Sequence, residues 1–338
     1  MVFILATGCR GCEHDQRVDA GPDRPEPPEC RPIAIPEGEI PDGSVGQSTV
    51  FVISALRFGQ IDDGLDLDCV DTPAGCRDGF CREGPDDGRD GRDNRLGVLA
   101  RRISEMAGSD LQAEMTQAIE SGRHPLVLRV IDATDLRDGR AGRVELDFAL
   151  DADGDPSDLF TGQGAVRPDP GGPAPGPSRF EPVAIADGVV TAGPTRDWMP
   201  LFWTRGQIAA VTVEAAYLRF RIVGPTSGDQ PGGRRVTDGL LAGAIAPARL
   251  SDAILDMDAR TARVLQRIGP LVRALVKRQG DLDLVPGGPT GQACRSDRDC
   301  PQGRTCRGER CVEPQEQFDA LSFGIAFEAV PVAEPTPR

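Results

Sequence analysis

Aromatic residues make up only 4% of this 338-residue chain, Lys277 is its one lysine, and His14 and His124 are its two histidines. A sugar-stacking platform would have to use Trp198, Trp203 and Tyr217, which are more typical of a core. The formal net charge of -15 repels phosphate backbones, and no basic block offsets it. We therefore expect no nucleic-acid partner.

The motifs of common catalytic sites are missing as well. The sequence has no GxSxG elbow, no HExxH, no GxxxxGK[ST] and no GxGxxG that follows a strand. His124 precedes Pro125 at a turn between an expected helix and an expected strand, a position typical of a capping or exposed side chain rather than of a general base. The sequence therefore predicts a protein that is not an enzyme.

The chain does contain 10 cysteines, 30 prolines and 41 glycines. The cysteines lie in three clusters, at residues 9–30, 69–81 and 294–311, which indicates an oxidising compartment, because reduced thiols would give such segments no support. The proline and glycine content indicates long turns and linkers around one sizeable domain.

Residues 1–9, MVFILATGC, are a short apolar run that ends in small residues before Cys9. The ATGC stretch resembles a relaxed lipobox of bacterial lipoproteins, with alanine where the family has leucine. The resemblance implies that residues 1–9 are the remnant of an export signal, that Cys9 carries a lipid, and that the protein is anchored to a membrane in the cell envelope, at the outer membrane or in the periplasm. Residues 10–47 are rich in proline and acidic side chains and read as an extended tether.

The main domain is expected at residues 48–285 and 318–332, followed by a tail at 333–338. Strands are predicted at 48–58, 125–136, 144–151, 198–203, 208–223, 238–245 and 318–332, with a hairpin over 179–195 that turns at Asp187-Gly188. Residues 95–120 predict two short helices separated at Gly108, the second starting at the Ser109–Gln112 capping pattern. Residues 159–179 read as a Gly/Pro loop, and residues 259–279 as a basic amphipathic helix packed on the sheet, although such a helix can also lie on an anionic membrane.

A cysteine-rich insert is expected at residues 292–313. Its sequence ACRSDRDCPQGRTCRGERCV spaces four cysteines as C-x5-C-x5-C-x4-C, and it resembles the Dickkopf N-terminal-like or EB-like cysteine-rich modules. The resemblance implies a small disulfide-bonded element outside the cytosol, with no catalysis. Its disulfide cysteines are Cys294, Cys300, Cys306 and Cys311.

The segment at residues 62–94 is called the acidic loop here. It alternates aspartate, glycine and cysteine with almost no apolar residue, so it needs a cross-link or a bound cation to become ordered. One bridge, Cys69 to Cys76 or Cys76 to Cys81, would stiffen it and leave the third cysteine to reach Cys30. Its GLDLDCVDT and DDGRDGRDN stretches resemble the Asp-repeat loops of thrombospondin type 3 modules.

Carboxylates at alternate positions can converge on Ca²⁺, which takes six to eight oxygen ligands. A second acidic stretch, residues 151–155 (DADGD), is called the acidic knot. Ca²⁺ is the cofactor that these two stretches favour, and a solvated acidic surface is the alternative. The candidate ligands are Asp66, Asp68, Asp71, Asp90, Asp93, Asp151, Asp153 and Asp155.

The layout as a whole, with its D-L-D-x-x-D-T and D-N-x-L patterns, resembles uncharacterised lipoproteins of high-GC Gram-negative bacteria. We expect a β-rich α+β fold, a sandwich or a curved antiparallel sheet with two helical regions and a small disulfide insert. The leading interpretation is a surface-displayed binding or structural lipoprotein with a protein or lipid ligand. The alternatives are a Ca²⁺-assisted hydrolase or lectin that uses the acidic loops, and a lipid-binding envelope protein with a cavity between helix and sheet.

Overall fold

The computed structural model describes residues 47–60, 63–65, 94–107, 110–133, 135–169, 176–204, 207–224, 233–256, 270, 273–276, 305–307, 310–312 and 320–333. The tether, residues 66–93 of the acidic loop and most of the cysteine-rich insert lie outside these ranges.

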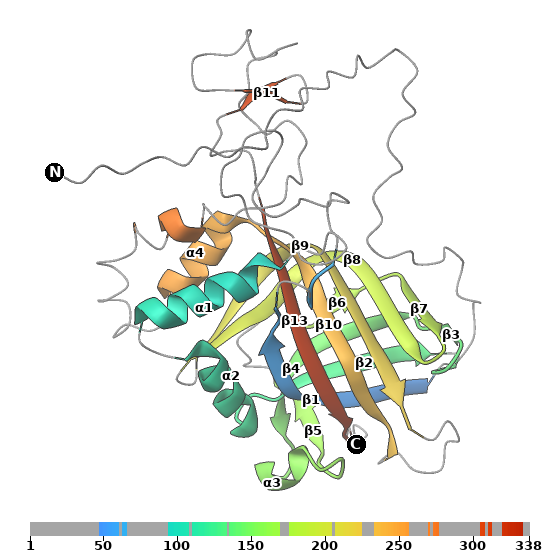
Figure 1. The fold of residues 1–338 in the computed structure, drawn as a ribbon. Coiled ribbons are helices and arrows are strands. Elements are labelled where there is room, and N and C mark those ends of the chain that lie inside the picture. Colours follow the sequence, from blue (N-terminus) through green and yellow to red (C-terminus); the bar gives the residue numbers. More distant parts are fainter. Residues whose placement is uncertain are drawn as a thin grey trace, which may run out of the picture.

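One strongly curved antiparallel sheet forms the body of the protein (Figure 1). It has eleven strands, ten of them in the order β3-β7-β8-β9-β10-β13-β1-β2-β4-β5, and β6 pairs with β4. The predicted β-rich α+β fold is confirmed, in its curved-sheet form. The strands of this sheet are β1 (Gln47–Phe58), β2 (Leu126–Ala133), β3 (Gly139–Arg140), β4 (Arg143–Asp151), β5 (Val166–Pro168), β6 (Ser178–Phe180), β7 (Val183–Ala186), β8 (Val189–Thr204), β9 (Gln207–Val223), β10 (Arg235–Ile245) and β13 (Leu321–Pro331).

The helices gather at one side of the sheet, where α1, α2 and α4 lie close together in Figure 1. They pack on what we call the inner face, and their apolar side chains, among them Leu99 and Met115, belong to the main core. Burying a side chain of this size contributes about 1.5–3 kcal/mol. The helices are α1 (Arg95–Ala107), α2 (Leu111–Glu120), α3 (Pro156–Leu159) and α4 (Pro247–Asp256).

The start of α2 is fixed by a side chain, within the capping pattern that the sequence contains. Asp110 is the N-cap, and its carboxylate accepts hydrogen bonds from the backbone N–H groups of Gln112 and Ala113, at 3.0 and 3.1 Å. These bonds satisfy two donors that the first helical turn leaves free. The two predicted helices are therefore confirmed.

The predicted hairpin at Asp187-Gly188 is also present, between β7 and β8. Both turn residues have positive φ, 49° and 72°, as a two-residue type I′ turn requires. The strand that follows is longer than expected. Residues 189–204 form one strand, β8, although the sequence suggested two separate pieces.

The sheet bends sharply partway along the neighbouring strands β8, β9 and β10. We call this place the sheet corner, and its residues are Gly193, Ala215 and Gly243. The pairing register shifts beside each of them. A Cβ on Gly193 would meet the carbonyl oxygen of Ala216, and one on Gly243 would meet the Ala216 Cα at 2.9 Å, so the strands approach too closely for larger residues. Ala215 has a φ of 46°, in the left-handed region. The corner directs the far halves of β8 and β9 toward α2 and α4.

The opposite, outer face carries a smaller apolar cluster that α3 and β5 help to cover. Val50, Val52 and Val127 pack there with Leu159 and Val166. The strand β5 and the start of β6 fall within residues 159–179, which were expected to be a Gly/Pro loop, so that expectation was wrong there. Each pairs along β4 for three residues, which is too short to leave a sequence pattern.

Other expected elements lie partly outside the described residues. Of the helix predicted over 259–279, residue 270 and residues 273–276 are described as helical, and Val276 is fully buried in the main core. Of the cysteine-rich insert, β11 (Thr305–Arg307) and β12 (Arg310–Val312) are described as a small hairpin, in which the backbones of Cys306 and Cys311 are opposite each other.

The central strands β1 and β13 run antiparallel and define two ends of the sheet. At the entry end, Phe51 of β1 is opposite Pro331 of β13, close to where the tether joins β1. At the loop end, Phe58 is opposite Ile325, where the acidic loop begins and where β13 follows the insert.

Candidate functional site

The base of the acidic loop is built at the loop end of the sheet, around Asn94. This residue is the only asparagine in the chain and is fully buried. Its side-chain amide donates to the carbonyl oxygens of Gln60 and Gly324, at 2.8 and 3.0 Å. Its Oδ1 accepts from the N–H groups of Gly324 and Gly97, at 2.9 and 3.3 Å. All four hydrogen-bonding positions of the amide are therefore satisfied.

Glycines allow the backbones at this base to touch. A Cβ on Gly59 would stand 2.6 Å from the amide nitrogen of Asn94, one on Gly97 would meet the carbonyl oxygen of Gly59, and one on Gly324 would meet that of Asp63. Real Cβ atoms essentially never approach other atoms within 3.0 Å. The two ends of the acidic loop are thus held in fixed positions against β13. We call this group of residues the loop-base junction: Gly59, Gln60, Asp63, Asn94, Gly97 and Gly324.

A second carboxamide completes the neighbouring strand. Gln112 of α2 accepts from the N–H of Phe58 at 2.9 Å and donates to the carbonyl oxygen of Leu56 at 2.9 Å. Both groups lie on the part of β1 that extends beyond its pairing with β2. Gln112 and Asn94 therefore take the place of missing strands, since each offers one donor and one acceptor to an open strand edge.

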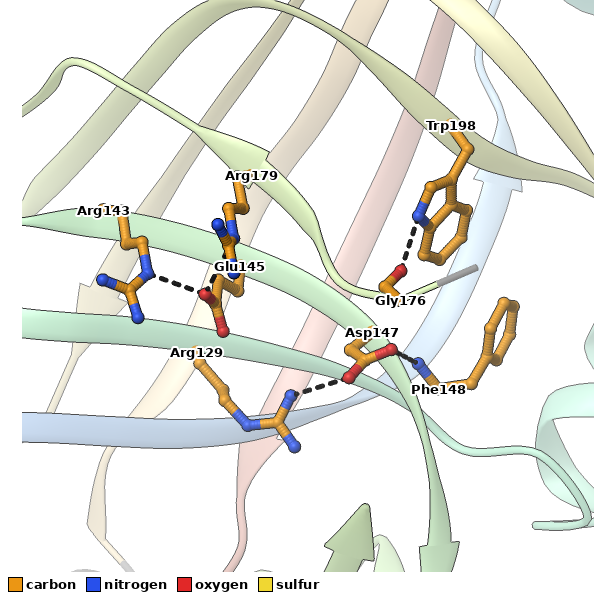
Figure 2. A network of polar contacts seen from close by, with 8 residues as sticks. All are labelled: Arg129, Arg143, Glu145, Asp147, Phe148, Gly176, Arg179 and Trp198. Atoms are coloured by element: carbon orange, nitrogen blue, oxygen red, sulfur yellow. Dashed lines mark hydrogen bonds and ion pairs between the residues drawn. The ribbon is translucent and has the colours of Figure 1, made fainter. Parts of the chain in front are cut away.

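A network of charged side chains lies on the outer face, across β2, β4 and β6 (Figure 2). Glu145 stands at its centre and is 7% exposed. Its carboxylate accepts from Nε of Arg143 at 2.7 Å and lies 3.5 Å from Nε of Arg179, and Figure 2 shows both guanidinium groups directed at it. The hydrogen bond that Arg143 donates to Glu145 raises the pKa of Arg143 above its usual value. Glu145 thus lies between two guanidinium groups.

The same network contains a second pair, Arg129 with Asp147, whose charged atoms are 3.5 Å apart. Burial raises the pKa of Asp147 above its ordinary value, although the hydrogen bond from the N–H of Phe148 and the charge of Arg129 both act to lower it. Close by, Phe148 stacks on Trp198 with ring centroids 5.5 Å apart, and the indole N–H donates to Gly176. The core role expected for Trp198 is confirmed, and these contacts hold β6 against β8.

The acidic knot connects β4 to α3 through a chain of short hydrogen bonds. The N–H of Asp155 donates to Asp153, and the N–H of Ser157 donates to Asp155, both at 3.0 Å. The bonds from Ser157 lower the pKa of Asp155, whereas burial raises the pKa of Asp151. Oδ2 of Asp151 and Oδ1 of Asp158 are buried without a hydrogen-bond partner. In the part of the chain that the structure describes, no three His, Cys, Asp or Glu side chains are grouped as metal ligands.

Comparison with protein-family models, curated proteins and solved structures finds no match for this chain. Among the described helices, none has the length and apolar character needed to cross a membrane.

Most of the residues singled out from the sequence lie outside the described part of the chain. His124 is described; its side chain is partly exposed, and its Nδ1, which is buried without a hydrogen-bond partner, lies 3.8 Å from Oδ2 of Asp169. A hollow of about 430 Å³ lies between the α3–β5 loop and the ends of β9, β10 and β13, with Arg235 and Val330 among its lining residues. The predicted residues outside the described ranges are Cys9, Asp66, Asp68, Cys69, Asp71, Cys76, Cys81, Asp90, Asp93, Cys294 and Cys300.

Sequence reasoning did not identify the role of Asn94, although it lies in the D-N-x-L pattern. One signal was present: an asparagine directly before an apolar helical stripe is a typical N-cap residue. The partner on β13 is 230 residues away in sequence, so no local pattern could predict it. The network around Glu145 was missed because its members come from three strands.

Proposed function

We propose that this chain is a non-enzymatic binding or structural lipoprotein displayed in the bacterial cell envelope and anchored through a lipid on Cys9. The observation that carries the proposal is the end of the sheet at which each neighbouring segment joins the central strands β1 and β13. The tether joins β1 at the entry end, and the acidic loop and the cysteine-rich insert join the sheet at the loop end. The two cysteine-bearing segments thus leave the domain opposite the side on which it is tethered.

This arrangement at opposite ends of the domain suits a displayed protein. An anchored domain presents to other molecules the end that points away from its anchor, and binding residues commonly lie on loops held by a rigid scaffold. The loop-base junction supplies such a scaffold, because Asn94 and the surrounding glycines fix both ends of the acidic loop. The acidic loop is therefore our candidate for the segment that contacts a ligand.

The charged groups that the structure brings together also favour a structural role for the sheet. Glu145 contacts two arginines, and Asp147 contacts Arg129 and a backbone N–H. Carboxylates engaged in this way stabilise strand pairing across β2, β4 and β6. Their arrangement supports a binding or structural protein more than a catalytic one.

The anchor and the display can be tested together. The full chain, preceded by a functional export signal, would be produced in a Gram-negative host that is fed radiolabelled palmitate. We expect label on the wild type and none on Cys9→Ser, with Cys12→Ser as the matched control that keeps its label. Protease added to intact cells should cleave the wild type within the acidic loop. An unlabelled wild-type protein in the cytosolic fraction would rule the proposal out.

Ca²⁺ binding at the acidic knot is a second candidate function, as required by a Ca²⁺-assisted hydrolase or lectin. The observation in its favour is the pair of buried, unpartnered carboxylate oxygens on Asp151 and Asp158. Ca²⁺ takes carboxylate oxygens as ligands at 2.3–2.6 Å and would give them partners. A cleft shared with Asp66, Asp68 or Asp93 stays a prediction, since those residues lie outside the described ranges.

A further inference from the structure

A hollow of about 430 Å³ lies at the entry end of the sheet, beside the apolar cluster of the outer face, against which Val330 packs. One of its walls is the loop between α3 and β5, and the other is formed by the ends of β9, β10 and β13. Pro331 in the second wall is opposite Phe51 of β1, so the hollow lies where the tether joins the domain. We call it the entry hollow, and its main lining residues are Thr161, Val223, Gly224, Arg235, Val330 and Pro331.

Hydrogen bonds hold the loop wall of the entry hollow in place. Thr161 donates to the carbonyl oxygen of Asp158 twice, from its N–H at 2.9 Å and from its hydroxyl at 2.7 Å. The N–H of Ala333 donates to the carbonyl oxygen of Gly164 at 3.0 Å, and the N–H of Val166 donates to that of Ala333 at 2.9 Å. These bonds tie the loop to α3 on one side and to the end of β13 on the other. The entry hollow is therefore preformed, as most small-ligand sites are.

Arg235 brings a positive charge to this hollow. The next residue, Val236, belongs to the main core, so the side chain of Arg235 points to the outer face. The pairing register places Arg235 opposite Val223 of β9. Because Val236 is opposite Ala329 of β13, Arg235 also lies beside Val330. The aliphatic part of Arg235 is thus flanked by two valines that line the hollow with it.

The guanidinium group of Arg235 is open to a ligand. The residue is exposed, and no described residue forms an ion pair or a hydrogen bond with its side chain. Arg221 of β9, by contrast, is engaged: its Nε lies 3.9 Å from Oδ2 of Asp238, and it donates to the carbonyl oxygen of Asp187 at 3.1 Å. A planar guanidinium can bind two oxygens of a phosphate at once. Arg235 between two valines therefore suits a phosphate-bearing ligand that also has an apolar part.

We propose that the entry hollow binds the phosphate of an anionic phospholipid headgroup, with Arg235 as the cation that holds it. A phosphate fills only part of the hollow, and Val223, Val330 and Pro331 offer apolar surface to the glycerol and the first methylene groups. The choice of a membrane lipid as the source of the phosphate rests on the proposed anchor at Cys9, because the tether brings the entry end to the membrane. Binding at the hollow seats the domain on the membrane at that end and leaves the loop end pointing away.

Isothermal titration calorimetry tests the proposal on the full chain carrying Cys9→Ser, which has no covalent lipid, so that the result does not depend on the anchor. The probe is dihexanoylphosphatidylglycerol below its micellar concentration. We expect saturable binding that Arg235→Gln weakens about tenfold to a hundredfold, because a charge-assisted contact is lost. Arg249→Gln, at an exposed arginine on α4, is the matched control and should leave the affinity unchanged. Thermal melts followed by circular dichroism check that both variants keep the fold.

Two further titrations distinguish the sources of the phosphate. Dihexanoylphosphatidylcholine has the same chains and no net charge, and we expect it to bind more weakly; equal binding would show that the apolar surface acts alone and would overturn the role of Arg235. Inorganic phosphate should also bind more weakly, since it has no apolar part, and equal or tighter binding would make the hollow a site for free phosphate instead of a lipid. The proposal also fails if phosphatidylglycerol does not bind or if Arg235→Gln leaves its affinity unchanged. Neither result affects the anchor, which is tested by the palmitate label on Cys9.

Discussion

The side chain of Asn94 pairs with Gly324 as a neighbouring strand would, accepting a hydrogen bond from its N–H and donating one to its carbonyl oxygen. The pairing occurs where β1 leaves the sheet and would otherwise expose the edge of β13. One side chain thus satisfies a strand edge, caps a helix and closes the base of a loop of about thirty residues.

Replacing Asn94 should therefore be costly. Asn94→Asp keeps the shape of the side chain but replaces its amide nitrogen, which donates to the carbonyl oxygens of Gln60 and Gly324, by an oxygen that can only accept. We therefore expect the free energy of unfolding to fall by about 2–5 kcal/mol. Urea denaturation followed by circular dichroism measures the loss. Gln117→Glu, at an exposed site on α2, makes the same chemical change and should cost less than about 0.5 kcal/mol. Similar losses for both variants would contradict the role assigned to the junction.

The sheet corner offers a substitution that should stabilise the protein. Ala215 has a φ of 46°, which costs an L-residue about 1–2 kcal/mol and costs glycine almost nothing. Glycine loses about 0.5–1 kcal/mol through the greater entropy of its unfolded chain, so we expect Ala215→Gly to be neutral or to raise stability by up to about 1 kcal/mol.

The adjacent corner residue provides the comparison. Gly193→Ala places a Cβ against the carbonyl oxygen of Ala216 and should lower the melting temperature by several degrees. Differential scanning calorimetry measures both variants. We expect the melting temperature to rise or stay unchanged in Ala215→Gly and to fall in Gly193→Ala. A loss of stability in Ala215→Gly as large as that in Gly193→Ala would show that the corner is not strained at Ala215.

The dependence of stability on pH should reveal Asp147. Its pKa is raised above the ordinary value of 3.8, so the folded state holds the proton more tightly than the unfolded state does. This contribution to stability is complete below pH 3.8 and is lost as the pH rises through the raised pKa. We expect the difference in unfolding free energy, Asp147→Asn minus wild type, to increase between about pH 3 and pH 6. Glu120→Gln, at the exposed end of α2, controls for the loss of a charge. A difference that falls with rising pH would mean that the pair with Arg129 dominates.

Ca²⁺ should raise the melting temperature of the protein if the acidic knot binds it. Stabilisation follows the ligand concentration relative to its dissociation constant, about 2.7 kcal/mol at one hundred times that constant. We expect Asp151→Asn to remove the shift between Ca²⁺ and EDTA, because Asp151 would lose a carboxylate ligand. Asp138→Asn, an exposed aspartate away from the knot, should keep it. A wild-type melt that does not change with Ca²⁺ would eliminate the site.

The cysteines of the insert should resist alkylation. We predict that iodoacetamide leaves Cys294, Cys300, Cys306 and Cys311 unmodified in the native, unreduced protein and labels all four after reduction. Two disulfides in a segment with no core of its own are expected to hold it together. Peptide mass mapping gives the result for each cysteine. Four free thiols in the native protein would contradict the prediction that the insert is a disulfide-bonded module.

Local patterns predicted the elements whose signals lie within a few residues. The Asp187-Gly188 turn and the two helices within residues 95–120 depend on turn chemistry and helical period, and the structure confirms them. The relationships that shape the candidate site are of another kind. Asn94 meets Gly324 across 230 residues, and Glu145 meets Arg179 only because β6 is a three-residue strand inside a Gly/Pro stretch. Contacts between distant segments leave no periodic trace in one sequence.

The pairing of β1 with β13 has a consequence for how the protein matures. The first strand of the sheet lies beside the last, so the middle of the sheet stays open until the final dozen residues of the domain have left the ribosome or crossed a membrane. Such long-range closure makes folding slow and leaves an unfinished chain loosely structured. A chain of that kind stays open enough to be threaded through a secretion channel, as the proposed location in the cell envelope would require.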